Sequence, residues 1–223
     1  LVGEADDPDR LVARHRVVAD LQRRHPGLRL PASRRVFHAL LPTILEQKVT
    51  GREAWLGWRR LLMRFGDPAP GPVPAGMRVF PEPSRWAMVP SWEWHRAGVG
   101  PDRSRTIVRA ARLASRLEAV VDLAADEADR RLRAVPGIGA WTAAEIRQRA
   151  LGDPDAVSLG DYHLPRLVAY ALAGEERADD ARMLELLEPY AGHRHRACLL
   201  LAHTAPMPPR RGPRLPVRDY RAF

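Results

Sequence analysis

The sequence has almost no cysteine and almost no lysine. Its 223 residues include one cysteine, Cys198, and one lysine, Lys48, so arginine supplies nearly all the positive charge. A single cysteine excludes a disulfide within the chain, a zinc site of several cysteines and a four-cysteine iron–sulfur cluster. It fits a protein of the reducing cytoplasm. The histidines show no metal-ligand spacing that indicates a site.

Long apolar runs are also missing. No stretch approaches the roughly 20 apolar residues of a membrane-spanning helix, and no charged-then-apolar signal segment is visible. We therefore expect no membrane partner. The chain begins at Leu1 rather than at methionine, which suggests a fragment or a processed form.

The net charge is +9, which suits a polyanionic partner such as nucleic acid. An arginine-rich composition that reflects a biased genome explains the charge equally well. Part of it lies in the segment 205–223, where five arginines stand against one aspartate. We expect this segment to be a flexible basic tail.

Apolar residues recur with helical spacing almost throughout, and no alternating strand pattern is present, so the expected fold class is all-α. Asp7 and Pro8 look like the start of a first helix, and Ser33 like the cap of a second, in which Pro42 should cause a kink or a break. Thr50 to Glu53 read as a capping box. The expected helices span about residues 7–25, 33–45, 51–65, 84–89, 92–97, 101–117, 126–134, 140–151, 162–172, 179–187 and 195–203, with a Pro- and Gly-rich loop over 66–83.

The segment Pro136-Gly137-Ile138-Gly139 lies between two expected helices and predicts a tight turn. Glycines permit backbone conformations closed to other residues and a close approach of another chain or ligand. The free amides of the helix that follows can bind phosphate oxygens. A simple connection between packed helices would look the same.

The order of motifs is more specific. VPGIGAWTA at 135–143, followed by LGDYHL at 159–164, resembles the helix–hairpin–helix (HhH-GPD) DNA glycosylase superfamily, and within it the bacterial DNA-3-methyladenine glycosylase II type. HPGLRLP at 25–31 and ILEQKVT at 44–50 resemble further family segments at matching separations, and FPEP at 80–83 and HRACLLL at 195–201 match more loosely. The resemblance covers about residues 25–203. It implies two helical lobes around a cleft that receives DNA: residues 36–153, and residues 1–35 with 154–204.

The resemblance makes Asp161 the catalytic carboxylate. Breaking an N-glycosidic bond builds positive charge on the sugar, which an adjacent anion stabilises, and the anion can also orient or deprotonate a water. Asp161 lies at an expected helix start, so a purely structural capping role is the alternative.

Some relatives carry a lysine two residues after the second hairpin glycine, whose amine forms a Schiff base and cuts the strand. This chain has Trp141 there. The expected enzyme is therefore a monofunctional glycosylase without AP lyase activity, which needs no cofactor and hydrolyses the N-glycosyl bond of a flipped, damaged and alkylated purine.

The resemblance also assigns a base pocket and DNA contacts. Trp141, Glu145 and Tyr162 would line the pocket. Glu145 stands where the family has an aromatic, so it either meets the base or is a solvated helix residue. The residues expected to contact DNA are Gln47, Lys48, Gly137, Gly139 and Thr142. Carbonyls of Arg133, Val135 and Ile138 are expected to hold a structural Na⁺ or K⁺.

Several features depart from the family pattern. Lys48 replaces an apolar wedge, Thr204 beside His203 stands where a stacking tryptophan is expected, and the β-rich N-terminal subdomain is absent or truncated. Trp86, Trp92 and Trp94 suit the core or the rim of a site better than a ligand. The basic cluster at 193–196 is either phosphate-facing or a solvated helix start.

The partner implied is double-stranded DNA with a damaged base, bound by a monomer in the bacterial cytoplasm, near the nucleoid. The alternatives are a non-catalytic or divergent helix–hairpin–helix DNA-binding protein and a helical protein-interaction domain. The latter predicts no salt-dependent affinity for DNA.

Overall fold

The computed structural model describes residues 3, 4 and 6–204, and the expected basic tail at 205–223 lies outside them. Within the described residues the chain is helical and has no strand; an isolated bridge joins Pro68 and Arg78 in the loop that follows α3. The all-α prediction is confirmed. No helix in this part of the chain is both long and apolar enough to span a membrane.

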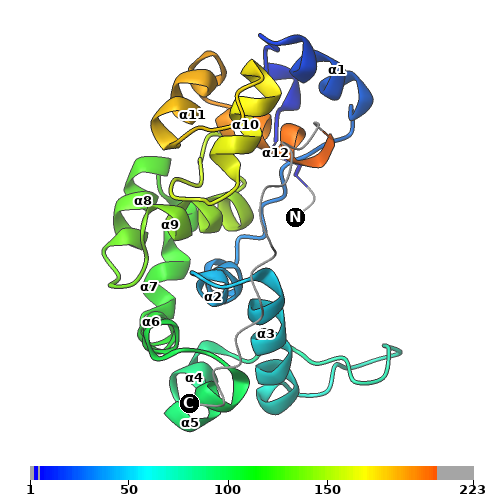
Figure 1. Cartoon of the computed structure of the whole chain (residues 1–223). Helices are drawn as coiled ribbons and strands as arrows, with labels where there is room; N and C mark the ends of the chain where they lie inside the picture. The colour runs from blue at the N-terminus through cyan, green and yellow to red at the C-terminus, as the bar shows by residue number, and fades with distance from the viewer. Residues whose placement is uncertain (1–2, 5, 205–223) are drawn as a thin grey trace. The chain divides into compact units, whose positions relative to one another are not determined.

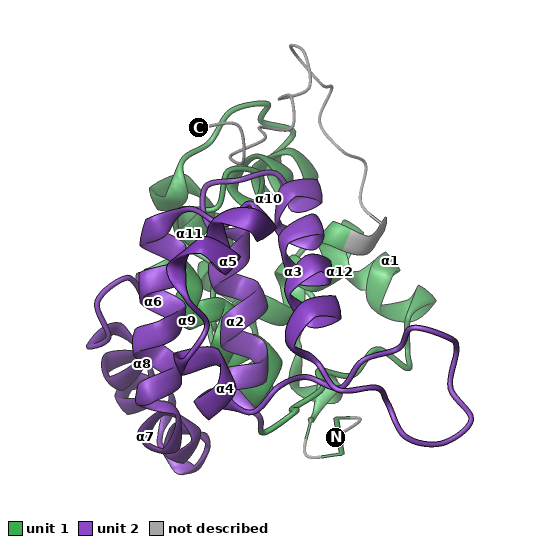
Figure 2. Cartoon of the chain, turned by 90° about the horizontal axis from the view of Figure 1, so that it is seen from below, with its two compact units in different colours: residues 1–34, 140–212 green, residues 35–139, 213–223 purple. Residues whose placement is uncertain are grey.

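The chain divides into two compact units, shown in different colours in Figure 2. Among the described residues, unit 1 comprises the segments up to residue 34 and from 140 to 204, and unit 2 comprises residues 35–139. The sequence predicts that the chain passes from one lobe to the other between residues 153 and 154. In the structure the chain passes from unit 2 to unit 1 directly after Gly139. The difference arises because residues 140–153 bond to the N-terminal segment: the Arg149 and Ala150 carbonyls accept from the Ser33 and Arg34 amides, at 3.1 and 2.9 Å.

Unit 2 contains seven α-helices and one 3₁₀ turn among its described residues (Figure 1). They are α2 (Val36–Glu46), α3 (Gly51–Phe65), α4 (Pro83–Ala87), α5 (Ser91–Ala97), α6 (Pro101–Arg112), α7 (Ala114–Glu118), η2 (Ala119–Asp122) and α8 (Ala125–Arg133). Helix α2 packs on α3 and α6, and α4 packs on α6.

The starts of α3 and α2 are capped in different ways, one by a neighbouring residue and the other by a residue distant in sequence. The capping box at α3 is confirmed, because the Thr50 hydroxyl accepts from the Glu53 amide and the Glu53 carboxylate accepts from the Thr50 amide. The predicted Ser33 cap of α2 is wrong. Glu118, distant in sequence, instead accepts from the Val36 and Phe37 amides at 2.8 and 2.9 Å.

Pro42 and three tryptophans of unit 2 can be compared with their predicted roles. Pro42 lies inside α2 without ending it, so the predicted break is wrong. Trp86 and Trp94 are buried, as core residues should be, and their tilted rings lie 5.9 Å apart between centroids, whereas Trp92 is exposed.

Unit 1 contains α1 (Arg16–Arg24), α9 (Ala140–Ile146), α10 (Leu164–Ala173), α11 (Asp180–Leu187) and α12 (Arg194–Thr204), with three shorter turns, η1 (Pro8–Arg10), η3 (Arg147–Leu151) and η4 (Glu188–Tyr190). The first helix begins at Arg16, because Asp7 and Pro8 start only the 3₁₀ turn η1. Helix α10 packs on α11 and α12, and α1 packs on α12. Their apolar faces form one core that includes Val18, Val168, Met183 and Leu201.

In the basic cluster at 193–196, Arg196 is buried and the other three residues are half-buried. Arg196 is 2% exposed and forms an ion pair with Asp6, and Arg194 forms one with Asp155. Desolvation lowers the pKa of His195 to about 4. Both arginines of the cluster are thus paired with carboxylates of unit 1, and a phosphate contact stays a prediction.

Candidate functional site

The turn that follows α8 belongs to unit 2 and is fixed by side chains from two other helices. Gln47, at the end of α2, donates from Nε2 to the Gly137 carbonyl at 3.0 Å. Arg109 on α6 donates from Nη1 to the Pro136 carbonyl at 2.8 Å. Two hairpin carbonyls are thus held in place, and Gln47 and Gly137, which are both predicted to contact DNA, lie together.

The two glycines of the turn have different reasons to be glycine. Gly137 has φ of +98°, and a Cβ there would lie 2.1 Å from Thr106 Oγ1 on α6. Packing and backbone conformation therefore both require glycine at 137. Gly139 is exposed, and nothing lies within 4 Å of the position of a Cβ. At 139 the fold leaves open space through which a ligand can approach the backbone.

Lys48 lies at the tip of the turn between α2 and α3. It is exposed and has φ of +54°, a left-handed conformation that costs a non-glycine residue about 1 kcal/mol or more. Its neighbour Gln47 makes the bond to Gly137 described above, so Lys48 lies close in sequence to a residue that touches the hairpin.

Ile138 and Val135 of the turn are buried, and the Val135 carbonyl accepts from the Ile138 amide at 3.0 Å. One carbonyl of the predicted cation site thus has a bond within the turn, and the ion at Arg133, Val135 and Ile138 stays a prediction. No cluster of three or more acidic, histidine or cysteine side chains suited to a metal occurs in the described part of the chain.

Helix α9 follows the turn directly and belongs to unit 1. Its first amides have no acceptor within the helix, as at every helix start. Thr142 lies in this first turn, but the residue is only 2% exposed, so its contact with DNA stays a prediction.

Asp161 lies opposite one face of α9. Trp141 donates from the indole Nε1 to Asp161 Oδ2 at 3.1 Å. Asp161 Oδ1 accepts from the amides of His163 and Leu164, both at 2.8 Å, at the start of α10. The carboxylate thus does cap a helix, as the alternative interpretation required, and it also faces Trp141. It is partly exposed, so solvent and ligands can reach it.

Glu145, one helical turn after Trp141, holds the loop that carries Asp161. Its Oε1 accepts from the Ser158 hydroxyl at 2.6 Å, and its Oε2 accepts from Arg149 Nη2 at 2.7 Å. Gln148 donates to the Ala156 carbonyl at 2.8 Å and to Ser158 Oγ at 2.9 Å. We name this set, Glu145, Gln148 and Ser158, the loop clamp.

Sequence reasoning missed the loop clamp, and its partners lie 10 to 13 positions apart across a loop. The clamp gives Glu145 a structural task inside unit 1. Tyr162 is predicted to line the base pocket with Trp141 and Glu145. In the structure it is 83% exposed, and its ring lies edge-on to the His163 ring, 4.9 Å apart between centroids.

The chain is similar in sequence to a DNA repair enzyme and in structure to DNA glycosylases. Over 149 residues the chain is 32% identical to a probable bifunctional transcriptional activator/DNA repair enzyme AlkA of Mycobacterium tuberculosis. That match covers 66% of this chain and 29% of the relative, so the chain spans under a third of that protein. A 3-methyladenine DNA glycosylase from Archaeoglobus fulgidus superposes with a TM-score of 0.69 at 22% identity, covering 84% of this chain and 66% of the other.

The chain has the helix–hairpin–helix DNA glycosylase fold. A Clostridium acetobutylicum 8-oxoguanine glycosylase/lyase, solved with double-stranded DNA, shares the fold at a TM-score of 0.68 and 14% identity, covering 83% of this chain and 64% of that one. The glycosylase fold thus accommodates more than one chemistry. No family model matches the chain.

Proposed function

We propose that this protein is a monofunctional DNA glycosylase of base-excision repair, which acts as a monomer on double-stranded DNA. It flips out a damaged, alkylated purine and hydrolyses the bond between that base and its sugar. The observation that carries the proposal is the Asp161 carboxylate. It is held between the Trp141 indole and the first amides of α10, in the loop that follows a hairpin of the glycosylase type.

In this mechanism the carboxylate acts mainly through its charge. As the glycosidic bond lengthens, the sugar becomes a cation, and Asp161 stabilises it and orients the water that attacks the anomeric carbon. The helix-start amides and the indole N–H fix both oxygens beforehand, so little reorganisation accompanies the reaction. A cationic alkylpurine is already a good leaving group and requires little acid assistance.

The DNA contacts follow from the turn and its neighbours. The open space at Gly139 suits the approach of a phosphate oxygen to the backbone where α9 begins. The exposed Lys48 supplies a charge for the DNA backbone in place of an apolar wedge. These contacts position DNA without reading its sequence, so affinity should fall steeply with salt.

Two side chains would face the extruded base. Tyr162 presents an exposed ring next to Asp161, and aromatic faces stack on a flipped purine. Trp141 presents its ring while its N–H holds the carboxylate. Glu145 belongs to the loop clamp in this account and acts on the reaction through the loop.

The absence of lysine at position 141 is the basis of the monofunctional assignment, because an amine there would attack the sugar. A panel of duplexes that each carry 3-methyladenine, 7-methylguanine, hypoxanthine, ethenoadenine or uracil tests substrate and reaction together. We expect release of an alkylated purine, an abasic strand that breaks only after alkali, and no adduct on borohydride reduction. Release of no base, or a borohydride-trapped adduct, would contradict the proposal.

A second candidate is a non-catalytic DNA-binding protein of the same fold. The observation in its favour is that Asp161 caps α10, which explains its carboxylate without any chemistry. This protein would bind duplexes with the same salt dependence but release none of the bases in the panel.

A further inference from the structure

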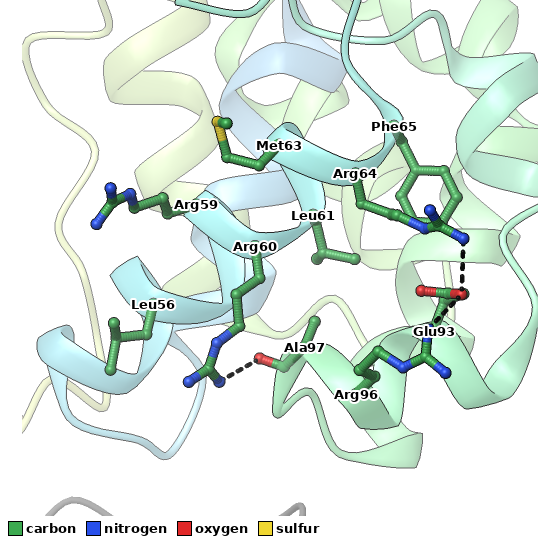
Figure 3. A pocket seen from close by; sticks show the side chains of 10 residues that line it. All are labelled: Leu56, Arg59, Arg60, Leu61, Met63, Arg64, Phe65, Glu93, Arg96 and Ala97. Carbon is green, nitrogen blue, oxygen red and sulfur yellow. Dashed lines mark hydrogen bonds and ion pairs between the residues drawn. The ribbon is translucent and has the colours of Figure 1, made fainter. Parts of the chain in front are cut away.

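Unit 2 has a groove on the surface formed by α3 and α5 that the glycosylase mechanism does not use (Figure 3). Its volume is about 570 Å³, within the range of pockets that accept ligands of several side chains. The apolar part of its lining consists of Leu56, Leu61, Met63, Phe65 and Ala97. Met63 is 46% exposed, so its side chain is available to a ligand.

The charged part of the lining is strongly basic. It consists of four arginines, Arg59, Arg60, Arg64 and Arg96, and one carboxylate, Glu93. The net charge of the lining is therefore +3.

Glu93 is already neutralised by two of these arginines. The Glu93 side chain is 9% exposed, and its carboxylate lies 3.5 Å from Arg64 and 3.2 Å from Arg96. The side chains of Arg64 and Arg96 are 63% and 70% exposed, so their outer faces remain accessible to a second carboxylate. A guanidinium has five N–H donors, so each arginine can meet a second carboxylate while it stays paired with Glu93.

The two helices that form the groove also carry exposed tryptophans. Trp55 is 54% exposed and its ring lies under the Arg59 guanidinium at 5.5 Å, while Trp92 is 64% exposed and is one helical turn from Arg96. Tryptophan, arginine and methionine are the side chains that most often anchor protein–protein interfaces.

We propose that this groove binds a short acidic segment of a partner protein. An apolar side chain of that segment enters between Leu56 and Met63, and its carboxylates meet Arg59, Arg64 and Arg96. The apolar floor of the groove suits such a segment better than a phosphate backbone, because the segment can supply an apolar side chain to cover that floor.

The groove lies away from the hairpin within unit 2. Gln47, which contacts the hairpin, precedes α3, and the residues of that helix that line the groove run from Leu56 to its last residue, Phe65. From Gly51 to Arg64 the helix rises by about 20 Å at 1.5 Å per residue. A segment bound in the groove therefore leaves the hairpin accessible. The proposal of peptide binding does not depend on the glycosylase activity.

The test uses the full chain and a fluorescein-labelled peptide of about twelve residues, in which two leucines and a phenylalanine are spaced among glutamates and aspartates. Binding is followed by fluorescence anisotropy. We expect saturable binding that falls at least tenfold with Arg64→Glu/Arg96→Glu, and likewise with the milder Arg59→Glu/Met63→Gln, which leaves the Glu93 ion pairs intact. A peptide with serine in place of its apolar residues should bind at least tenfold more weakly.

The matched control is Arg16→Glu/Arg23→Glu on α1, where two exposed arginines also flank one carboxylate, Asp20. It changes the net charge equally and should leave peptide affinity unchanged. Equal weakening by this control, binding unaffected by both groove variants, or preference of the groove for a single-stranded oligonucleotide over the peptide would overturn the proposal. Base release by the groove variants should equal that of the unmodified chain.

Discussion

The indole N–H of Trp141 donates to Asp161 Oδ2 at 3.1 Å, and this bond joins α9 to the loop before α10. The sequence places these residues 20 positions apart and gives each a separate task, base pocket and catalysis. In the structure the tryptophan also positions the carboxylate. Its role in the proposed reaction is therefore to hold Asp161 as well as to face the base.

Replacing Trp141 with phenylalanine tests the positioning role, because the ring remains and the donor is lost. A hydrogen bond to a charged group is worth about 1.5 to 3 kcal/mol, so the single-turnover rate of base release should fall by about tenfold to a hundredfold. DNA affinity should change little. The control is Trp55→Phe on α3, which should keep the normal rate. A normal rate in Trp141→Phe would show that the ring alone matters.

The two hairpin glycines should respond differently to alanine. Gly137→Ala places a Cβ against Thr106 at a residue with positive φ, and should lower the free energy of unfolding by about 2 kcal/mol or more. Gly139→Ala meets open space, so stability should be nearly unchanged while DNA affinity falls. Thermal unfolding and DNA titration of both variants check this contrast. Loss of stability in Gly139→Ala with normal DNA binding would contradict it.

The loop clamp can be tested with a double-mutant cycle between Glu145 and Ser158. Glu145→Ala and Ser158→Ala each remove one side of the 2.6 Å bond, and the pair should show a coupling energy of about 1 kcal/mol or more in the free energy of unfolding. Each should also slow base release, because Asp161 lies on the loop that the clamp holds. Additive effects on stability, together with loss of activity in Glu145→Ala alone, would instead indicate that Glu145 meets the substrate directly.

The lowered pKa of His195 predicts that the free energy of unfolding falls in acid. Desolvation lowers its pKa to about 4 in the folded state, whereas the unfolded chain has the ordinary value near 6.5. At pH 7 both states are neutral at this position. As pH falls below 6.5 the unfolded chain takes up the proton first, so the folded state loses about 3 kcal/mol by pH 4.

Urea unfolding at pH 7.5 and pH 5 measures this loss, with His195→Gln as the variant in which the slope should flatten. The pKa values of His38 and His193 are lowered in the same direction, mainly by burial, so a smaller slope should persist in the variant. An unchanged slope in His195→Gln would contradict the assignment.

Features set by neighbouring residues could be predicted from the sequence. The capping box at Thr50, the hairpin turn and the helical pattern all depend on residues a few positions apart, and all three are present in the structure. The glycosylase resemblance rested on such motifs, and the fold confirms it.

Features set by distant partners could not be predicted. The carboxylate of Glu118 caps α2 from 81 and 82 positions away, and Thr106 explains Gly137 only once α6 lies beside the turn. The ion pairs of the basic cluster likewise involve Asp6 and Asp155, which no local pattern connects to α12. The division of the chain at Gly139 has the same origin, since the bonds of residues 149 and 150 reach back to the N-terminal segment.

The central claim, that Asp161 acts in base excision and does more than cap α10, is tested most directly by Asp161→Asn. Asparagine keeps an oxygen that can accept from the helix-start amides and removes the charge. Asp179→Asn is the matched control, because Asp179 also caps a helix of unit 1, accepting from the Arg182 amide at 2.9 Å.

The measurement is the single-turnover rate of base release from a 3-methyladenine duplex, with DNA affinity determined in parallel. We predict that Asp161→Asn lowers the rate at least about a hundredfold and keeps DNA affinity, while Asp179→Asn keeps both. Base release at the normal rate by Asp161→Asn would contradict the account.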